Sequence, residues 1–259
     1  MNNITNYVEK YKKETQEKLK QLFKEAEEKN SEKFLRAFFA IDTKRYPNKI
    51  MSYVSSLEFK ELLDLLKTFN KIVISYKVDK NTRTRLRLFL YCHILEVDLP
   101  YMIIANIARI LAGEPYDSRI YLTTEEGKKL CEYPWQKIKY LNDLGKKVGL
   151  DLSAIWNRFF RPELRNGFSH SQYCLRNRQG DVFLTSEVSP TTRTKKPPNK
   201  EFYSYKEVED LYMAACEFLQ VFIEITKQFL SKYKNGNYYS IGYDIGPVRF
   251  DLNRKSWGF

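Results

Sequence analysis

The sequence predicts a mainly α-helical protein, an up-and-down helical bundle with a small β-hairpin insertion and an N-terminal helical extension. Apolar residues recur at three- and four-residue spacing in most segments of the 259-residue chain, as on one face of a helix. Two short extended runs flank a polar turn at Gly180, which predicts the hairpin. Hydrophobic residues make up 43% of the chain. This fraction excludes a disordered protein and is enough for a sizeable core.

Residues 1–50 are predicted to form the N-terminal helical extension. Residues 3–30 are amphipathic, and their apolar positions fall near helical spacing: Ile4, Val8, Tyr11, Leu19, Leu22 and Ala26. Because Thr15 interrupts this stripe, a packed surface helix is favoured over a coiled coil. A second apolar segment, KFLRAFFAI, follows and leads to a turn signal at Tyr46-Pro47-Asn48.

Residues 54–234 are predicted to form one helical domain. Helical spacing predicts a first helix over 56–75 and a second from about 82, broken or kinked at Pro100, that resumes over 101–111 and stops at Gly113. Residues 114–134 are interpreted as a polar connection. Further helices are predicted over 135–148 and over 205–233. Between them, a helix capped by Asp151 or Ser153 is predicted to run toward Arg165. Pro162 is expected either to kink this helix or to be the first residue of a new one.

An insertion at about residues 172–200 is predicted to interrupt this domain. It contains the hairpin, with strands at 173–176 and 182–185, and a Pro-rich basic loop, SPTTRTKKPPNK. Residues 235–259 form a C-terminal tail that is rich in Tyr, Gly and Asn. The sequence assigns nothing in this tail beyond a strand or a packed extension.

Composition and motifs exclude several classes of protein. The chain has 44 Lys and Arg against 32 Asp and Glu, a net charge of +12, which agrees with an RNA partner. Four separate cysteines without a CxxC pair predict reduced thiols and no metal site. The absence of a Walker A, GxGxxG or HExxH motif predicts no cofactor. The longest apolar stretch, about 99–112, is shorter than the roughly 20 residues of a membrane span. We therefore expect a cytoplasmic protein with no membrane partner.

The two histidines each follow an arginine at short spacing. Arg165 stands four residues before His170, in RNGFSH, where an amphipathic helix gives way to a polar hairpin. Arg87 stands five residues before His93 inside an apolar helix, where spacing places His93 on the inner face with Phe89. This context predicts a hydrogen-bonded core histidine at position 93 and a functional segment at 165–170.

The RNGFSH segment resembles the signature of HEPN-domain ribonucleases, in which an Arg, often followed by Asn, precedes a His by a few residues. The resemblance covers about residues 54–234 and extends to an all-α bundle with the motif near the end of its third core helix. It implies a metal-independent endoribonuclease that acts by 2′-OH transesterification, leaves 2′,3′-cyclic phosphate and 5′-OH ends, and works as a homodimer with a composite active site. Such proteins are often toxins or abortive-infection effectors in antiviral defence, which implies an inhibitory or activating protein partner.

The residue types in this segment suit RNA cleavage. His170 would act as general acid or base, because histidine titrates near neutral pH. Arg165 would stabilise the phosphate in the transition state, and Asn166 would orient the phosphate or the imidazole. Gly167 is expected to allow a tight turn that brings the motif together. On an unbroken helix the side chains at 165 and 170 would point about 140° apart, so one straight helix would not bring them together.

Other residues are candidates to support the site or bind RNA. Glu96 matches the polar residue that HEPN domains often carry on an earlier helix, and a partly buried ion-pair partner is the other interpretation. Asn106 is a further supporting candidate. We expect phosphate contacts from Arg161, Arg176 and Arg178. Tyr173 would stack on an unpaired base or pack in the core.

Two alternatives to the nuclease stay open. A non-catalytic HEPN-like module would bind RNA, a nucleotide or a protein and keep the bundle and the charge. A helical scaffold with an accidental motif would use Arg165 and His170 for stability alone. Exposure of both side chains in a shared cleft would favour the nuclease, and their burial in the core would favour a structural role.

Overall fold

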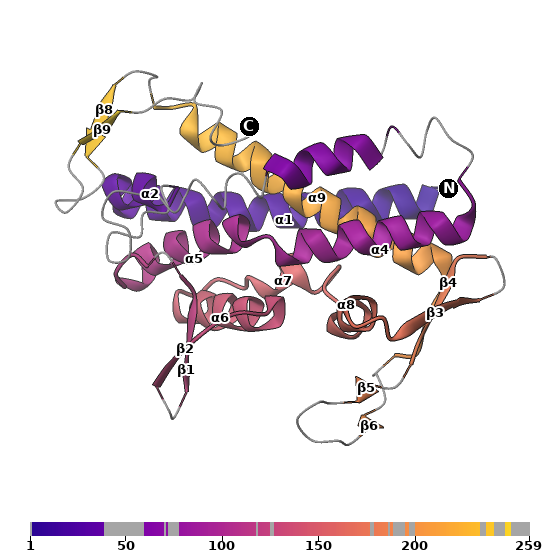
Figure 1. Cartoon of the computed structure of the whole chain (residues 1–259). Helices are drawn as coiled ribbons and strands as arrows, with labels where there is room; N and C mark the ends of the chain where they lie inside the picture. Colours follow the sequence, from indigo (N-terminus) through magenta and orange to yellow (C-terminus); the bar gives the residue numbers. More distant parts are fainter. Residues whose placement is uncertain are drawn as a thin grey trace. The chain divides into compact units, whose positions relative to one another are not determined.

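A computed structural model shows a mainly helical chain, as predicted (Figure 1). It describes residues 2–38, 60–69, 71, 78–117, 119–124, 127–176, 179–185, 187–188, 195–196, 200–233, 237–240 and 247–249. The predicted turn at 46–48, Arg178, most of the basic loop and the end of the tail lie outside these residues, as do the side chains of Ile4 and Val8.

The chain divides into two compact units. The first unit comprises Met1–Glu61, Val97–Asn157 and Phe218–Phe259, and the second comprises Leu62–Glu96 and Arg158–Glu217. The long helix α9, Tyr205–Leu230, contributes its first half to the second unit and its second half to the first. The domain limits predicted from the sequence stay a prediction.

The first unit is a set of helices around an aromatic core. Helix α5 packs against α1, α2 and α6. The Tyr101 ring stacks on Trp156 with centroids 5.4 Å apart, and Trp156 meets Phe218 at 5.0 Å. The helices of this unit are α1 (Asn2–Lys29), α2 (Ser31–Ala37), α5 (Asp98–Ala112), α6 (Pro134–Lys147) and α7 (Ser153–Trp156).

Two small hairpins in the first unit were not predicted as such. Strands β1, Tyr121–Thr124, and β2, Gly127–Leu130, pair where the sequence predicted only a polar connection, so that prediction is wrong. All of β2 is exposed, and a strand without a buried face has no apolar alternation to reveal it. In the tail, β8 (Tyr238–Ser240) pairs with β9 (Pro247–Arg249). For this tail the sequence predicted either a strand or a packed extension.

Helix α5 is a core helix, as its apolar sequence predicted. The stretch Lys80–Ala112 contains an 18-residue window apolar enough to cross a membrane, but 72% of that window is buried inside the structure. The two polar residues that interrupt α5 are buried and bonded. Asn106 exchanges hydrogen bonds with the backbone of Asp117, and Arg109 donates to Asn106 at 3.0 Å. Asn106 thus holds a loop of the first unit.

The second unit places two helices beside a small sheet. Helix α8 packs against α4 and against strand β4 (Figure 1). Residues 60–69 are also helical, within the range predicted for the first helix of the domain. The sequence predicted a break at Pro100, but α4 ends earlier, and Val97 separates it from α5. Pro162 is the first residue of α8, one of the two outcomes predicted for it. The helices are α4 (Lys80–Glu96) and α8 (Pro162–Ser169).

The predicted hairpin is present and forms part of a three-stranded sheet. Strand β3, Tyr173–Arg176, pairs antiparallel with β4, Asp181–Leu184, one residue from the predicted limits. Strand β7, Phe202–Tyr203, adds to the other edge of β4. Gly180 ends the turn with φ of 81°, a conformation that favours glycine. In the insertion, β5 (Glu187–Val188) pairs with β6 (Lys195–Lys196).

The buried hydroxyl of Tyr91 fixes the chain that leads into α8. It donates a hydrogen bond to the Phe159 carbonyl at 2.7 Å and accepts one from the Arg161 backbone N–H at 2.9 Å. Burial raises the pKa of Tyr91 well above its usual value, so the hydroxyl keeps its proton at all physiological pH values. Because Arg161 is the N-cap of α8, one side chain of α4 determines where α8 begins.

Replacing Tyr91 with phenylalanine is expected to lower the free energy of unfolding by about 1–3 kcal/mol, because it removes the hydrogen bonds to the Phe159 carbonyl and to the partly buried Arg161 N–H. Chemical denaturation measures this loss. Tyr173→Phe is the matched control, since the Tyr173 hydroxyl bonds to no residue that the structure describes and its removal should change stability by less than about 0.5 kcal/mol. Equal stability of Tyr91→Phe and wild type would contradict the role of Tyr91.

Candidate functional site

The predicted motif, residues 165–170, occupies the last five residues of the short helix α8 and the residue after it. In the first turn of α8, the Glu163 carboxylate accepts a hydrogen bond from the hydroxyl of the buried Tyr203 at 2.6 Å. The next residue, Leu164, is buried. These contacts and the Tyr91 hydroxyl hold the start of the helix. The motif residues Arg165 and Asn166 follow in the next turn, so their backbone is fixed before they meet any ligand.

The end of α8 is closed by a Schellman motif. The Ser171 N–H donates to the Phe168 carbonyl at 3.1 Å, and the Gln172 N–H donates to the Gly167 carbonyl at 2.7 Å. Ser171 adopts a positive φ of 56°, which is uncommon for residues other than glycine and costs about 1 kcal/mol. His170 is the C-cap, and its side chain is exposed at the end of the helix.

Gly167 has a different role from the predicted one. It lies inside α8 and makes no turn, so the expectation of a tight turn at this position is wrong. A Cβ on Gly167 would come within 2.7 Å of the Leu184 side chain in β4. The glycine is therefore needed for the close approach of α8 to the sheet, which sequence alone did not indicate.

Glu96 and Arg165 form a two-donor ion pair between α4 and α8. The Nε and Nη2 atoms of Arg165 both donate to Oε1 of Glu96, at 2.9 and 2.5 Å. Nη1 of Arg165 donates to Oδ1 of Asn166 at 3.0 Å. The Arg165 side chain is only 14% exposed, whereas Glu96 is 44% exposed. Three of the five guanidinium N–H groups are thus used, and the other two bond to no described residue.

The remaining predicted residues differ in how far their side chains are exposed. Arg161 is half-buried at the N-cap of α8. Tyr173 is half-buried at the start of β3, with its ring 5.3 Å from that of Phe168. Arg176 is exposed, and its guanidinium lies 4.5 Å from the Phe183 ring centroid. The structure thus joins Arg165, Asn166 and Glu96 directly and leaves His170 and Arg176 exposed.

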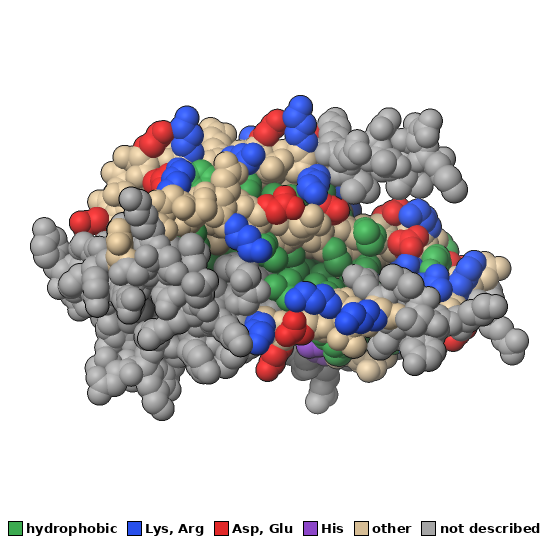
Figure 2. All heavy atoms as spheres, turned by 90° about the horizontal axis from the view of Figure 1, so that it is seen from above, with side chains coloured by type: hydrophobic (Ala, Val, Ile, Leu, Met, Phe, Trp, Pro, Cys, Tyr) green, Lys and Arg blue, Asp and Glu red, His purple; other side chains and the backbone are tan. Residues whose placement is uncertain are grey.

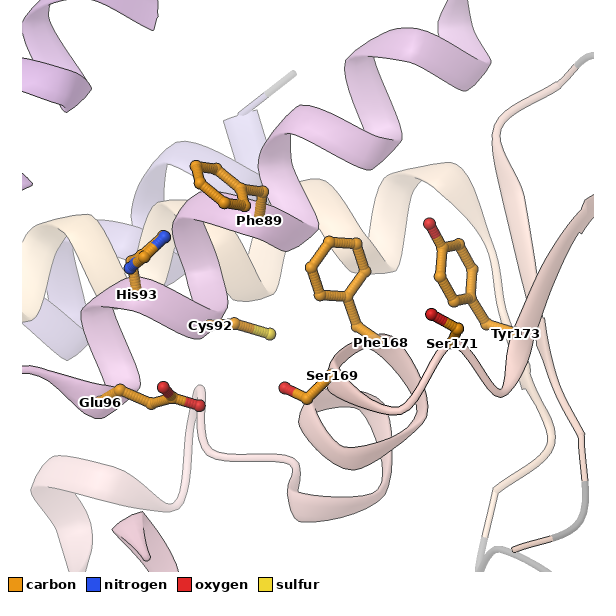
Figure 3. Close-up of a pocket in the computed structure, with 8 residues that line it drawn as sticks. All are labelled: Phe89, Cys92, His93, Glu96, Phe168, Ser169, Ser171 and Tyr173. Carbon is orange, nitrogen blue, oxygen red and sulfur yellow. The ribbon is translucent and has the colours of Figure 1, made fainter.

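A pocket of about 360 Å³ opens between α4 and the C-terminal end of α8 (Figure 3). Glu96 is the one predicted supporting residue that lines it, and Tyr173 is the one predicted RNA-binding residue. Figure 3 shows the Cys92 sulfur and the Ser169 hydroxyl on facing sides of the space between the two helices. The residues that line the pocket are Phe89, Cys92, His93, Glu96, Phe168, Ser169, Ser171 and Tyr173.

The prediction that His93 is a core histidine is wrong. His93 is exposed and lines the pocket, where its ring meets the edge of the Phe89 ring with centroids 4.3 Å apart. Helix α4 carries apolar residues on more than one face, so spacing could not select the buried one. The cue that was available is the pair of positions 93 and 96, which places an imidazole and a carboxylate within one turn of each other.

Cys92 lines the pocket but is unsuited to nucleophilic chemistry. Burial, together with the neighbouring Glu96 charge, raises the pKa of Cys92 to about 12, although Arg165 and a hydrogen bond to Ser169 act in the opposite direction. The thiol therefore stays protonated at neutral pH, and a protonated thiol is a poor nucleophile. The other polar groups that line the pocket are the imidazole of His93, the carboxylate of Glu96 and the hydroxyls of Ser169, Ser171 and Tyr173.

The basic excess is not gathered into one patch on the face shown in Figure 2. There the Lys and Arg side chains are interspersed with Asp and Glu. Among the residues that the structure describes, no three His, Cys, Asp or Glu side chains come close enough together to hold a metal ion.

Comparisons with known proteins give no independent assignment. No protein-family model, curated protein or solved structure matches this chain. Inference about its function therefore rests on the residues of the site.

The cysteines should differ in their rates of alkylation in the native state. A thiol with a pKa of about 12 is ionised to roughly one part in ten thousand at pH 8, so Cys92 and Cys216 should react with iodoacetamide at least about 100-fold more slowly than the exposed Cys174. Peptide mass spectrometry after timed labelling measures the rates. Labelling in denaturant is the control, because all four cysteines should then react alike. Rapid native labelling of Cys92 would contradict the assignment of an inert thiol.

Proposed function

We propose that this protein is a metal-independent endoribonuclease of the HEPN type, which cleaves RNA by transesterification through the 2′-OH. The main support is the way in which Arg165 is held. Glu96 binds it from a second helix, Asn166 binds it from the next position, and the motif ends at an exposed histidine. This arrangement combines a fixed phosphate-binding group with a titratable group that solvent and substrate can reach.

Arg165 would stabilise the charge that develops on the phosphate during cleavage. The bonds to Glu96 and Asn166 restrict the guanidinium, so binding a phosphate would cost less side-chain entropy than on a free arginine. Its two remaining N–H groups are available as donors to phosphate oxygens. Donors that are already oriented contribute most to stabilising a transition state.

His170 would move the protons of the reaction. At the C-cap of α8 its imidazole is exposed, so it can accept the proton of the 2′-OH or donate one to the leaving 5′-oxygen. Asn166 would orient the phosphate. Arg161, Arg176 and Arg178 would bind neighbouring phosphates, and Tyr173 would stack on a base.

We further propose a homodimer with a composite active site. Arg165 packs toward Glu96, whereas His170 lies five residues later at the exposed end of α8. A helix separates side chains five positions apart by about 140°, which favours a site in which the two groups of one chain do not act on the same phosphate. A second copy related by a two-fold axis would supply the missing group. Sedimentation as a 31 kDa monomer at concentrations that support cleavage would contradict this proposal.

The resemblance also supports a role as a cytoplasmic toxin or abortive-infection effector that a protein partner restrains or activates. Uncontrolled RNA cleavage would harm the cell that makes the enzyme. Induced expression of wild type should therefore arrest growth, and His170→Ala should not. Normal growth with active enzyme would oppose this role.

The direct test is cleavage of total cellular RNA by the purified protein in EDTA. Wild type should cleave, and Arg165→Ala and His170→Ala should each lose about 100-fold or more of the rate, as is typical when an electrostatic stabiliser or a general acid or base is removed. Lys227→Ala is the matched control, because it removes an exposed cation on α9 and should leave cleavage unchanged.

All variants must first show the wild-type unfolding midpoint. Cleavage that needs Mg²⁺ would contradict the metal-independent mechanism. Loss of cleavage in His93→Ala but not in His170→Ala would contradict the assignment of His170, since these are the only two histidines in the chain.

A non-catalytic RNA-binding module is the second candidate. It is favoured by one observation, that the charge of Arg165 is already neutralised by Glu96 and only 14% of its side chain is exposed. Such a module would bind RNA in EDTA without cutting it. Wild-type protein that binds single-stranded RNA and leaves it intact would support this candidate over the nuclease.

A further inference from the structure

We propose that the pocket between α4 and the end of α8 binds one unpaired nucleobase of the RNA and prefers bases that carry an amino group over uracil. This inference deepens the proposed function and rests on it for the identity of the ligand as RNA. Beside Phe168 and Ser169 of the RNGFSH motif, it concerns residues outside the motif, above all Phe89 and Oε2 of Glu96.

The size of the pocket suits a single base. Its volume of about 360 Å³ lies at the lower end of the range of roughly 300–1,000 Å³ that small-molecule sites occupy. A paired base inside a duplex could not enter such a space without leaving its stack. The pocket therefore selects for single-stranded or unpaired RNA.

Aromatic rings on both helices provide stacking surfaces. On α4, the Phe89 side chain is 42% exposed, which is unusual for a phenylalanine, and it lies beside the His93 ring. Near the end of α8, Phe168 and Tyr173 lie together with an angle of 36° between their rings (Figure 3). Aromatic faces of this kind hold bases in single-stranded RNA without depending on sequence.

The polar groups of the pocket favour bases that carry an amino group. Oε1 of Glu96 accepts both hydrogen bonds from Arg165, and Oε2 accepts none from the residues that the structure describes. A carboxylate oxygen accepts a hydrogen bond from the amino group of adenine, cytosine or guanine. Uracil carries no amino group. Its N3–H can donate to the same oxygen, but the carbonyl oxygens on both sides of that N–H would be repelled by the charge, so uracil binds more weakly. The hydroxyls of Ser169 and Ser171 add adaptable donors at the end of α8.

The pocket also adjoins the phosphate-binding group. Glu96 lines the pocket, and its Oε1 atom holds Arg165. A base bound at Oε2 would therefore lie next to the guanidinium that is proposed to bind the phosphate. This link favours RNA over a free base, because RNA joins the base and the phosphate covalently.

Binding of RNA that cannot be cleaved tests the pocket. Fluorescence anisotropy in EDTA would compare 2′-O-methyl decamers of adenine, cytosine and uracil. Wild type should bind the adenine and cytosine decamers roughly tenfold more tightly than the uracil decamer, the effect of one hydrogen bond to a charged group. Phe89→Ala should weaken binding of all three by at least about fivefold, the effect of losing a stacking surface.

Two variants sharpen the test. Trp135→Ala is the matched control, since Trp135 is an aromatic residue of similar exposure, 47%, that lies outside the pocket, and this variant should bind as wild type does. Glu96→Gln should lose the preference against uracil, because an amide can also donate to a carbonyl oxygen. Equal binding by Phe89→Ala and wild type, equal affinity for all three decamers, or no binding would overturn the proposal.

Failure of the pocket and failure of the nuclease give different results. If only the pocket proposal fails, unmodified RNA is still cut in EDTA and Phe89→Ala binds as wild type does. If only the nuclease fails, the decamers bind with the expected preference and unmodified RNA stays intact.

Discussion

The ion pair between Glu96 and Arg165 is the interaction on which the candidate site depends. It joins the last residue of α4 to the middle of α8 across 69 positions of sequence. Two donors on one carboxylate oxygen define the orientation of the guanidinium, as a single contact would not. The pair links Glu96, which lines the pocket, to a mostly buried arginine and keeps that arginine in place.

The surrounding second unit positions this pair through backbone contacts. The Tyr91 hydroxyl fixes the entry to α8, and the bonds around Ser171 fix its exit into β3. Gly167 lets the helix approach β4, which itself is paired on both edges. A helix of only eight residues would not be stable alone. Its shape here comes from α4 and the sheet, so changes in either would reach the motif.

The sequence predicted the helices well because their apolar residues repeat clearly. The inner face of α9 illustrates this, since Val208, Tyr212 and Phe222 fall near helical spacing and are all buried. Prediction from sequence failed where the pattern of apolar residues did not reveal which face is buried. Helix α4 carries apolar residues on more than one face, so His93 was wrongly assigned to the core. Strand β2 is exposed along its length and has no apolar alternation, so it was missed. The resemblance implied that Glu96 supports the site, but its two-donor contact with Arg165 and the pocket depend on tertiary packing that spacing does not encode.

The ends of the cleaved RNA test the central claim most directly. Purified protein would be incubated in EDTA with a defined single-stranded RNA and with copies that carry one 2′-deoxy nucleotide, and the products would be analysed by mass spectrometry. A site built on Arg165 and a histidine should leave 2′,3′-cyclic phosphate and 5′-OH ends and should fail wherever the attacking 2′-OH is missing. Products with 5′-phosphate and 3′-OH ends, or cleavage of the phosphodiester on the 3′ side of the deoxy nucleotide, would contradict it.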